Sequence, residues 1–186
     1  MAHENDTDYG PLSGLIGSWR GDKGMDVAPE PEGPDDNPYY ETITFEAAGD
    51  VDNAGEQFLA IVHYKQLVQR KSNDEVFHHQ VGYWLWDADS ELLMQSFTIP
   101  RAVALVAGGK ASVSGQTVVL DVAAGGDAPE WPVAQSPFMV EKARTLAFEQ
   151  RLIVTSDHLS YRQTTLLDIY GKPFEHTDQN ELQRVR

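Results

Sequence analysis

The stretch Tyr40-Glu41-Thr42-Ile43-Thr44-Phe45 alternates its side chains with a period of two residues. This period is typical of a β-strand, because successive side chains of a strand point to opposite faces of the sheet. Segments of the same character recur along the chain, and turn-forming residues separate them. These further segments span 58–70, 76–86, 92–99, 102–106, 111–114, 117–123, 144–154, 159–169 and 177–185.

The segments predict an all-β protein of roughly ten antiparallel strands joined mostly by tight turns. Stretches with a helical period are short: residues 11–17 predict one helical turn, and 140–146 a weak helix. Strands joined as hairpins leave two unpaired edges, which a sandwich protects in part and a closed barrel removes. A barrel of about ten strands is too wide to be filled by its own side chains. We therefore expect a ligand-sized cavity inside it.

The chain of 186 residues is long enough for one domain with a full hydrophobic core. Residues 1–10 are polar, and we expect them to be disordered. Residues 11–186 then form a single β-barrel domain, without internal repeats or an interdomain linker. The segment 26–38 is rich in Pro, Glu and Asp, and this composition predicts a loop without regular structure.

Charge and composition exclude several classes of partner and chemistry. The formal net charge is −15, which disfavours nucleic acid and anionic lipid as partners. Cysteine is absent, so disulfides, thiolate metal sites and cysteine nucleophiles are excluded. No apolar run reaches the roughly 20 residues of a membrane span, and the N-terminus does not read as a secretory signal. Together these features favour a cytoplasmic location.

His176, at the start of the last predicted strand, is the sharpest candidate for a functional residue. One neutral histidine is enough to bind haem iron as an axial ligand. Asp178, Asn180 and Leu182 share its face of the strand, and the two polar neighbours do not resemble an apolar haem pocket. A structural or surface role for a lone histidine is therefore the alternative.

Two further residues are candidates for ligand binding. Arg101 follows Pro100 between two apolar segments, so it lies either at a strand edge or inside the barrel. Inside, it would need an anion, which a buried acid or a ligand carboxylate could supply. Trp19, between Gly17 and Gly21, is placed to plug one end of the barrel, where it could also sense a ligand.

Other histidines carry weaker signals. His78 and His79 lie on opposite faces of one strand, so they cannot both bind the same metal ion. His158 follows Asp157 in a predicted turn, but no Gly-x-Ser-x-Gly motif supports a serine hydrolase. We therefore predict no catalytic residue from these positions.

The segment Leu12-Ser13-Gly14-Leu15-Ile16-Gly17-Ser18-Trp19-Arg20-Gly21 resembles the opening motif of nitrobindins, which are haem-binding barrels similar to fatty-acid-binding proteins. The same family, which includes the C-terminal domain of a THAP-type protein, resembles this chain in four later segments. These are Tyr40-Glu41, His79-Gln80-Val81-Gly82-Tyr83, Leu159-Ser160-Tyr161 and Gly171-Lys172-Pro173-Phe174-Glu175-His176. The resemblance implies a ten-stranded antiparallel, calycin-like β-barrel with a short N-terminal helical turn.

The resemblance also implies a function. Characterised nitrobindins hold haem b through one histidine of the final strand, bind nitric oxide and isomerise peroxynitrite. By position, His176 would be that axial ligand of the haem iron. Three alternatives remain open: a fatty-acid-like carrier that uses Arg101 to bind a carboxylate, an enzyme with an unrecognised site, and an interaction domain with an empty barrel.

Overall fold

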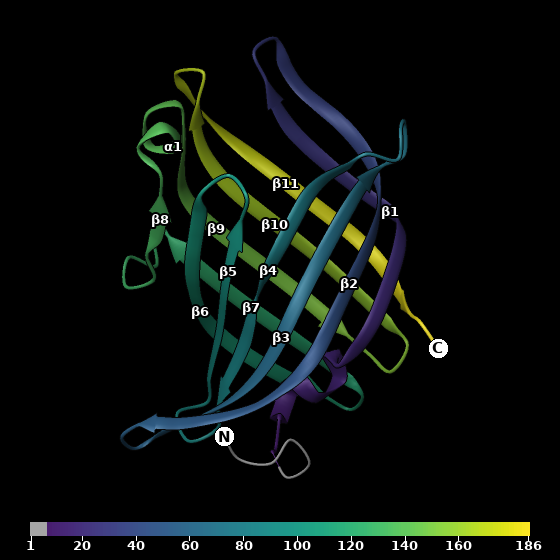
Figure 1. Cartoon of the computed structure of the whole chain (residues 1–186), viewed down its shortest axis with the longest axis vertical. Coiled ribbons are helices and arrows are strands. Elements are labelled where there is room, and N and C mark those ends of the chain that lie inside the picture. Colours follow the sequence, from purple (N-terminus) through teal and green to yellow (C-terminus); the bar gives the residue numbers. More distant parts are fainter. Residues whose placement is uncertain (1–6) are drawn as a thin grey trace.

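The computed structural model describes residues 7–186, and nearly all of the regular structure is β-sheet (Figure 1). A 3-10 helix, η1 (Gly10–Leu15), precedes the strands, and one short helix, α1 (Pro137–Lys142), interrupts them. The strands are β1 (Gly17–Glu30), β2 (Gly33–Ala54), β3 (Gln57–Arg70), β4 (Val76–Asp87), β5 (Leu92–Ile99), β6 (Val103–Ser114), β7 (Thr117–Gly125), β8 (Val133–Gln135), β9 (Ala143–Val154), β10 (His158–Ile169) and β11 (Lys172–Arg184).

The strands form one closed antiparallel barrel. Their order is β5-β4-β3-β2-β1-β11-β10-β9-β7-β6, and the pairing of β5 with β6 closes the ring. The three-residue strand β8 pairs with β6 and is not part of the closed ring. The structure therefore confirms the predicted ten-stranded all-β barrel with a short helical turn at its start.

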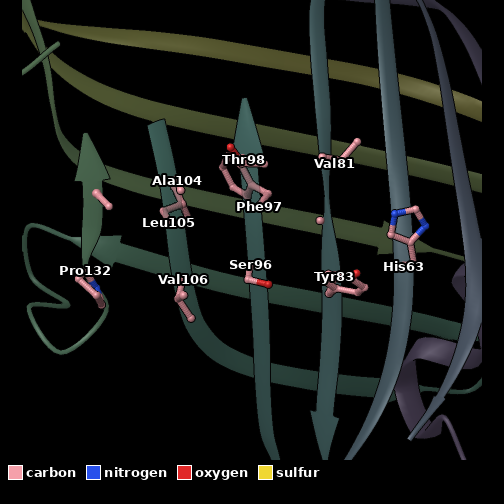
Figure 2. A pocket seen from close by; sticks show the side chains of 12 residues that line it. His63, Val81, Tyr83, Ser96, Phe97, Thr98, Ala104, Leu105, Val106 and Pro132 are labelled. Carbon is pink, nitrogen blue, oxygen red and sulfur yellow. The ribbon is translucent and has the colours of Figure 1, made fainter. Parts of the chain in front are cut away.

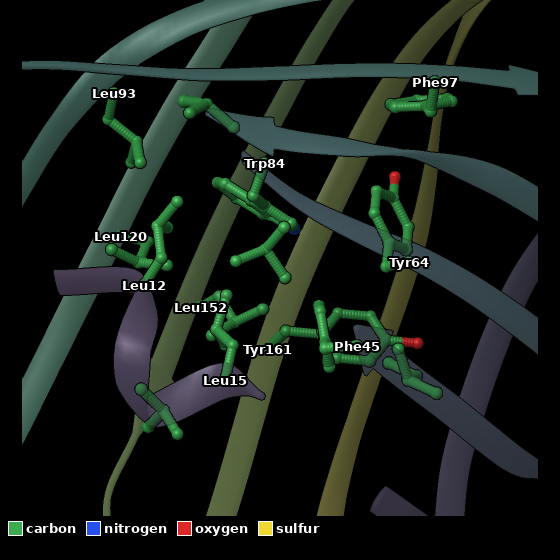
Figure 3. Close-up of a cluster of buried hydrophobic side chains, with 14 of the residues drawn as sticks. Leu12, Leu15, Phe45, Tyr64, Trp84, Leu93, Phe97, Leu120, Leu152 and Tyr161 are labelled. Atoms are coloured by element: carbon green, nitrogen blue, oxygen red, sulfur yellow. The ribbon is translucent and has the colours of Figure 1, made fainter. Parts of the chain in front are cut away.

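The hydrophobic core fills the end of the barrel that η1 covers (Figures 1 and 3). Leu12 and Leu15 of η1 are fully buried there, and the indole Nε1 of Trp19 donates to the Leu15 carbonyl oxygen at 2.7 Å. The Arg184 guanidinium lies 4.2 Å from the centre of the Trp19 ring and donates to the carbonyl oxygens of Gly14 and Ile16. Through Arg184, strand β11 thus holds η1 against the end of the barrel.

The acidic segment 26–38 is not a loop, and this prediction was wrong. It forms the outer half of the β1–β2 hairpin, in which Asp26 pairs with Asn37 and Pro29 with Pro34. The hairpin extends the barrel wall beyond a bulge between Gly21 and Gly24. A β-carbon at Gly24 would collide with the ring of Tyr39, so glycine is required there for the strands to pack.

The expectation for the N-terminal segment also needs correction where the structure describes it. Residues 1–6 lie outside the described part of the chain. Tyr9 is buried in the core, its hydroxyl accepts from the Gly49 amide at 3.0 Å, and Thr7 donates to Asp50 at 2.7 Å. Residues 7–10 therefore belong to the folded domain, because an aromatic anchor holds them against β2.

Helix α1 lies at the end of the barrel opposite η1 (Figure 1). Its first turn is capped by Ser136, whose hydroxyl accepts from the Met139 amide at 3.3 Å, and Pro137 occupies the first helical position. The helix therefore begins earlier than the expected 140–146. Within residues 7–186, no helix combines the length and the apolar character needed to cross a bilayer.

Candidate functional site

A cavity of about 340 Å³ occupies the half of the barrel that the hydrophobic core leaves open. The outer part of the β1–β2 hairpin, the β10–β11 hairpin, the β5–β6 turn and α1 surround it. One wall is apolar and is formed by Phe97, Ile99, Val103, Leu105, Phe148 and Leu167. The opposite wall is polar and carries most of the groups that could perform chemistry.

Glutamines and a tyrosine separate the cavity from the core. Gln80 and Gln95 both donate to the hydroxyl of Tyr64, at 2.6 and 3.1 Å, and Gln95 also donates to Gln150 at 3.1 Å. Among the described residues, the buried Oε1 atom of Gln95 has no hydrogen-bond partner. Gln80 lines the cavity and belongs to its floor, whereas Gln95, which is not among the lining residues, leaves one buried acceptor that a water molecule could satisfy.

Glu41 is a fully buried acid beside this floor. Its carboxylate accepts from Gln66 at 2.5 Å, from Tyr161 at 2.9 Å and from Asn180 at 2.7 Å. Burial raises the pKa of Glu41 to about 7, and these hydrogen bonds oppose the rise. The Tyr161 hydroxyl also lies 2.8 Å from that of Tyr39, so Glu41 anchors a chain of polar groups that reaches the cavity wall.

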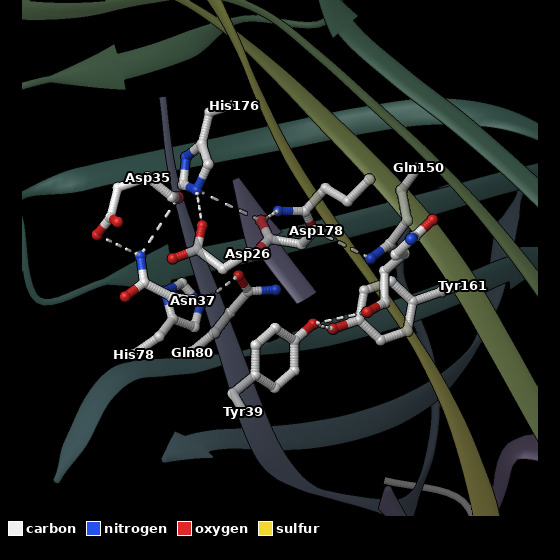
Figure 4. Close-up of polar contacts among 12 residues, drawn as sticks. Asp26, Asp35, Asn37, Tyr39, His78, Gln80, Gln150, Tyr161, His176 and Asp178 are labelled. Atoms are coloured by element: carbon white, nitrogen blue, oxygen red, sulfur yellow. Dashed lines mark hydrogen bonds and ion pairs between the residues drawn. The ribbon is translucent and has the colours of Figure 1, made fainter. Parts of the chain in front are cut away.

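His176 projects into the cavity and contacts two aspartates (Figure 4). Its Nε2 atom lies 2.6 Å from Oδ1 of Asp26 and 3.8 Å from Oδ2 of Asp178. Burial lowers the pKa of His176. The hydrogen bond with Asp26 and the charges of Asp178 and Asp26 together outweigh this effect, so the pKa lies above its ordinary value. Burial raises the pKa of Asp178 to about 6.

Strand alternation and register bring these three residues together. His176, Asp178 and Asn180 alternate along β11, so all three face the interior of the barrel. In the pairing of β1 with β11, Asp26 lies directly opposite Asp178. The contact between Asp26 and His176 therefore depends on the outer hairpin continuing as regular sheet.

The other predicted residues occupy different places. Arg101 lies in the exposed β5–β6 turn and lines the mouth of the cavity. Trp19 is fully buried in the core and is not among the residues that line the cavity. His78 lines the cavity, whereas His79 faces outward and is exposed, as their opposite positions on one strand predict.

Sequence reasoning missed Asp26 and Glu41. Glu41 shares its strand face with Ile43 and Phe45, and this pattern could have marked it as a buried acid. Asp26 carried no such signal, because its partner His176 lies 150 positions away.

A second hollow, of about 400 Å³, lies on the outer face of β4, β5 and β6 (Figure 2). Outward-facing Tyr83, Ser96 and Val106 line it, and His63 stands at its side. It contains no cluster of titratable groups within the described chain. This hollow therefore offers less chemistry than the inner cavity.

Comparisons with known proteins agree with this architecture. The profile of a family described as "THAP4-like, heme-binding beta-barrel domain" matches residues 8–184. No curated protein matches the chain. Among solved structures, the chain is similar to the crystal structure of Rv2717c from M. tuberculosis, with 19% sequence identity and a TM-score of 0.71. The similarity covers 96% of this chain and 100% of that one. The chain therefore belongs to the THAP4-like, haem-binding β-barrel family, in agreement with the resemblance to nitrobindins that its motifs show.

Proposed function

We propose that this protein binds haem b in its inner cavity, with His176 as the axial ligand of the iron. The observation that carries the proposal is the position of His176, whose imidazole projects from β11 into the cavity. Membership of a haem-binding family supports it independently.

The residues present fit a haem in three respects. The apolar wall that includes Phe97, Leu105 and Phe148 can contact the faces of a porphyrin. Arg70 and Arg101 at the mouth can pair with its two carboxylates. His176 supplies the nitrogen donor, and its Nε2 atom must exchange the hydrogen bond with Asp26 for the bond to iron.

Bound haem would supply an iron centre for the nitric oxide and peroxynitrite chemistry that the resemblance to nitrobindins implies. The chain's own residues would do the rest: His176 would hold the group, and the apolar wall would exclude water from it. Gln80 would offer a polar group to the ligand at the floor of the cavity.

A second candidate function is the transport of an amphipathic carboxylate without haem. Arg101 favours it, because this residue lines the mouth and has no ion pair or hydrogen bond within the described chain. A carboxylate head would pair with Arg101 while its apolar tail contacts the wall formed by Ile99 and Val103. An empty barrel is the outcome if neither class of ligand binds.

Titration with ferric haem tests the first proposal. We expect a sharp Soret band at one haem per chain, which His176→Ala abolishes. His79→Ala is the matched control, because that imidazole is exposed on the other face of the barrel wall. Circular dichroism would verify that both variants remain β-barrels. An unchanged spectrum in His176→Ala would remove this residue from the haem site, and no band in the wild type would favour the carrier.

A further inference from the structure

We propose that Asp26, His176 and Asp178 form a binding site for one divalent transition-metal ion in the haem-free protein. One ligand atom from each residue lies within 4.8 Å of the other two. Asp26 is buried, and His176 and Asp178 are partly buried at the polar wall of the cavity. The inference does not rest on haem binding, because it needs only the three side chains.

The donor set selects the class of metal. One imidazole nitrogen and two carboxylate oxygens suit first-row divalent ions such as Zn²⁺, Fe²⁺, Mn²⁺ and Co²⁺. A site of oxygen ligands alone would instead favour Mg²⁺ or Ca²⁺. The presence of His176 therefore distinguishes this cluster from an ordinary group of acidic residues.

The distances are close to those that a bound ion requires. Metal–ligand bonds of about 2.1 Å in tetrahedral geometry place neighbouring ligand atoms about 3.4 Å apart. The Nε2 atom of His176 is 2.6 Å from Asp26 and 3.8 Å from Asp178, so the two separations lie on either side of that value. For these two separations, replacing the hydrogen-bonding proton by an ion requires adjustments of less than about 1 Å, and every pair of ligand atoms in the cluster lies within 4.8 Å.

The charges around the cluster favour a cation. Asp178 accepts one hydrogen bond from the described residues, a long one of 3.4 Å from Gln163, so its carboxylate is poorly compensated. The cavity lining as a whole carries more carboxylates than guanidiniums. The carboxylates are Asp26, Glu30, Asp35 and Asp178, and the guanidiniums are Arg70 and Arg101. A divalent ion would neutralise the excess where it is most buried.

The site also leaves room for exchangeable ligands. Three protein ligands leave at least one coordination position of a tetrahedral ion unfilled, and that position would face the cavity. His78 lines the same cavity without belonging to the cluster. Water or a small anionic molecule from the cavity could complete the coordination.

Metal and haem would compete for one atom, the Nε2 of His176. Asp26 would have opposite roles toward them: it is a ligand for the divalent ion but an obstacle to the iron of haem. The two ligands should therefore exclude each other, and one substitution should change their affinities in opposite directions.

The experiment titrates the haem-free protein with Co²⁺, followed by visible absorption, and with Zn²⁺, followed by calorimetry. We expect one ion per chain. Asp26→Asn and Asp178→Asn should each weaken binding by about tenfold or more, since even residues that only orient metal ligands change affinity by about 10–100-fold. Asp35→Asn is the matched control, because it removes the same charge from the same cavity outside the cluster. We expect the affinity of Asp35→Asn for Co²⁺ and Zn²⁺ to remain within about twofold of the wild-type affinity.

The outcomes are distinct from those of the haem titration. Equal losses in all three variants would mean that the acidic cavity attracts cations without a defined site, and this would overturn the inference. A titration that shows no binding of one ion per chain would overturn the inference as well. Haem binding that fails while Co²⁺ binds would reject only the proposed function. If both ligands bind, Asp26→Asn should strengthen haem binding while it weakens Co²⁺ binding.

Discussion

The Nε2 atom of His176 lies 2.6 Å from Oδ1 of Asp26, across the seam where β1 pairs with β11. This contact joins residues 150 positions apart and places a buried carboxylate against the one side chain that the sequence marks as a ligand for haem iron. In the two proposals above, haem and a divalent ion would both have to displace this contact.

The contact should also stabilise the fold. Asp26→Ala leaves the half-buried imidazole without its partner, and we expect the free energy of unfolding to fall by about 1–3 kcal/mol. Urea unfolding followed by circular dichroism would measure the loss. The double variant Asp26→Ala/His176→Ala should lose less stability than the sum of the losses in the two single variants, because both substitutions remove the same interaction. Full additivity would show that the two side chains act independently.

Glu41 should make stability depend on pH. Its pKa is raised from 4.5 in the unfolded chain to about 7 in the folded protein, so the folded state binds the proton more tightly. Its contribution is therefore most favourable below pH 4.5 and is lost as the pH rises to about 7, by an amount on the order of 3 kcal/mol.

The variant Glu41→Gln should remove that dependence, because glutamine does not titrate. Chemical unfolding of both proteins at several pH values between 4.5 and 7 would give the two slopes. Their difference, rather than the stability of either protein, is the informative quantity, since glutamine also changes the hydrogen bonds with Gln66 and Asn180. Parallel slopes would show that Glu41 is already ionised in the folded protein at low pH.

The bulge at Gly24 should not tolerate a side chain. A β-carbon there collides with the Tyr39 ring, so we expect Gly24→Ala to destabilise the protein by about 1–3 kcal/mol. Gly14→Ala is the control, because its β-carbon would meet Val154 at an ordinary 3.6 Å. Thermal unfolding of the two variants would compare them. Equal melting temperatures would mean that the Tyr39 ring moves aside freely.

Arg101 should distinguish a carboxylate ligand from a neutral one. A charge-assisted hydrogen bond contributes about 1.5–3 kcal/mol, so Arg101→Gln should weaken the binding of a long-chain carboxylate by about tenfold or more. The alcohol of the same chain length should bind both proteins alike. Isothermal titration of the acid and the alcohol would measure both. Equal losses for the two ligands would assign Arg101 a structural role.

Alternation along the strands predicted the barrel and placed His176 on β11, because a period of two reports directly which side chains share a face. It also placed His78 and His79 on opposite sides of β4, as the structure shows. Both inferences depend on neighbours within a few residues. Local pattern was therefore enough for them.

The outer hairpin could not be predicted in the same way. Pro29, Pro34 and the surrounding acids discourage strand formation locally, yet the segment pairs with itself as a hairpin, and its first residues, Asp26 and Val27, also pair with β11. Tertiary pairing overrides the local preference there. For the same reason, local sequence pattern could not predict that Asp26 lies opposite Asp178, nor the cluster around His176 that this pairing creates.

The pairing of β1 with β11 also has a consequence for the order of events during synthesis. At roughly 5–20 residues per second, about 8–30 seconds pass between the synthesis of Asp26 and that of His176. Until then β1 has an unpaired edge, and the contact between Asp26 and His176 cannot form. The proposed haem and metal sites would therefore be complete only once β11 has been made, while the unpaired edges of the unfinished sheet remain open to other chains and to chaperones.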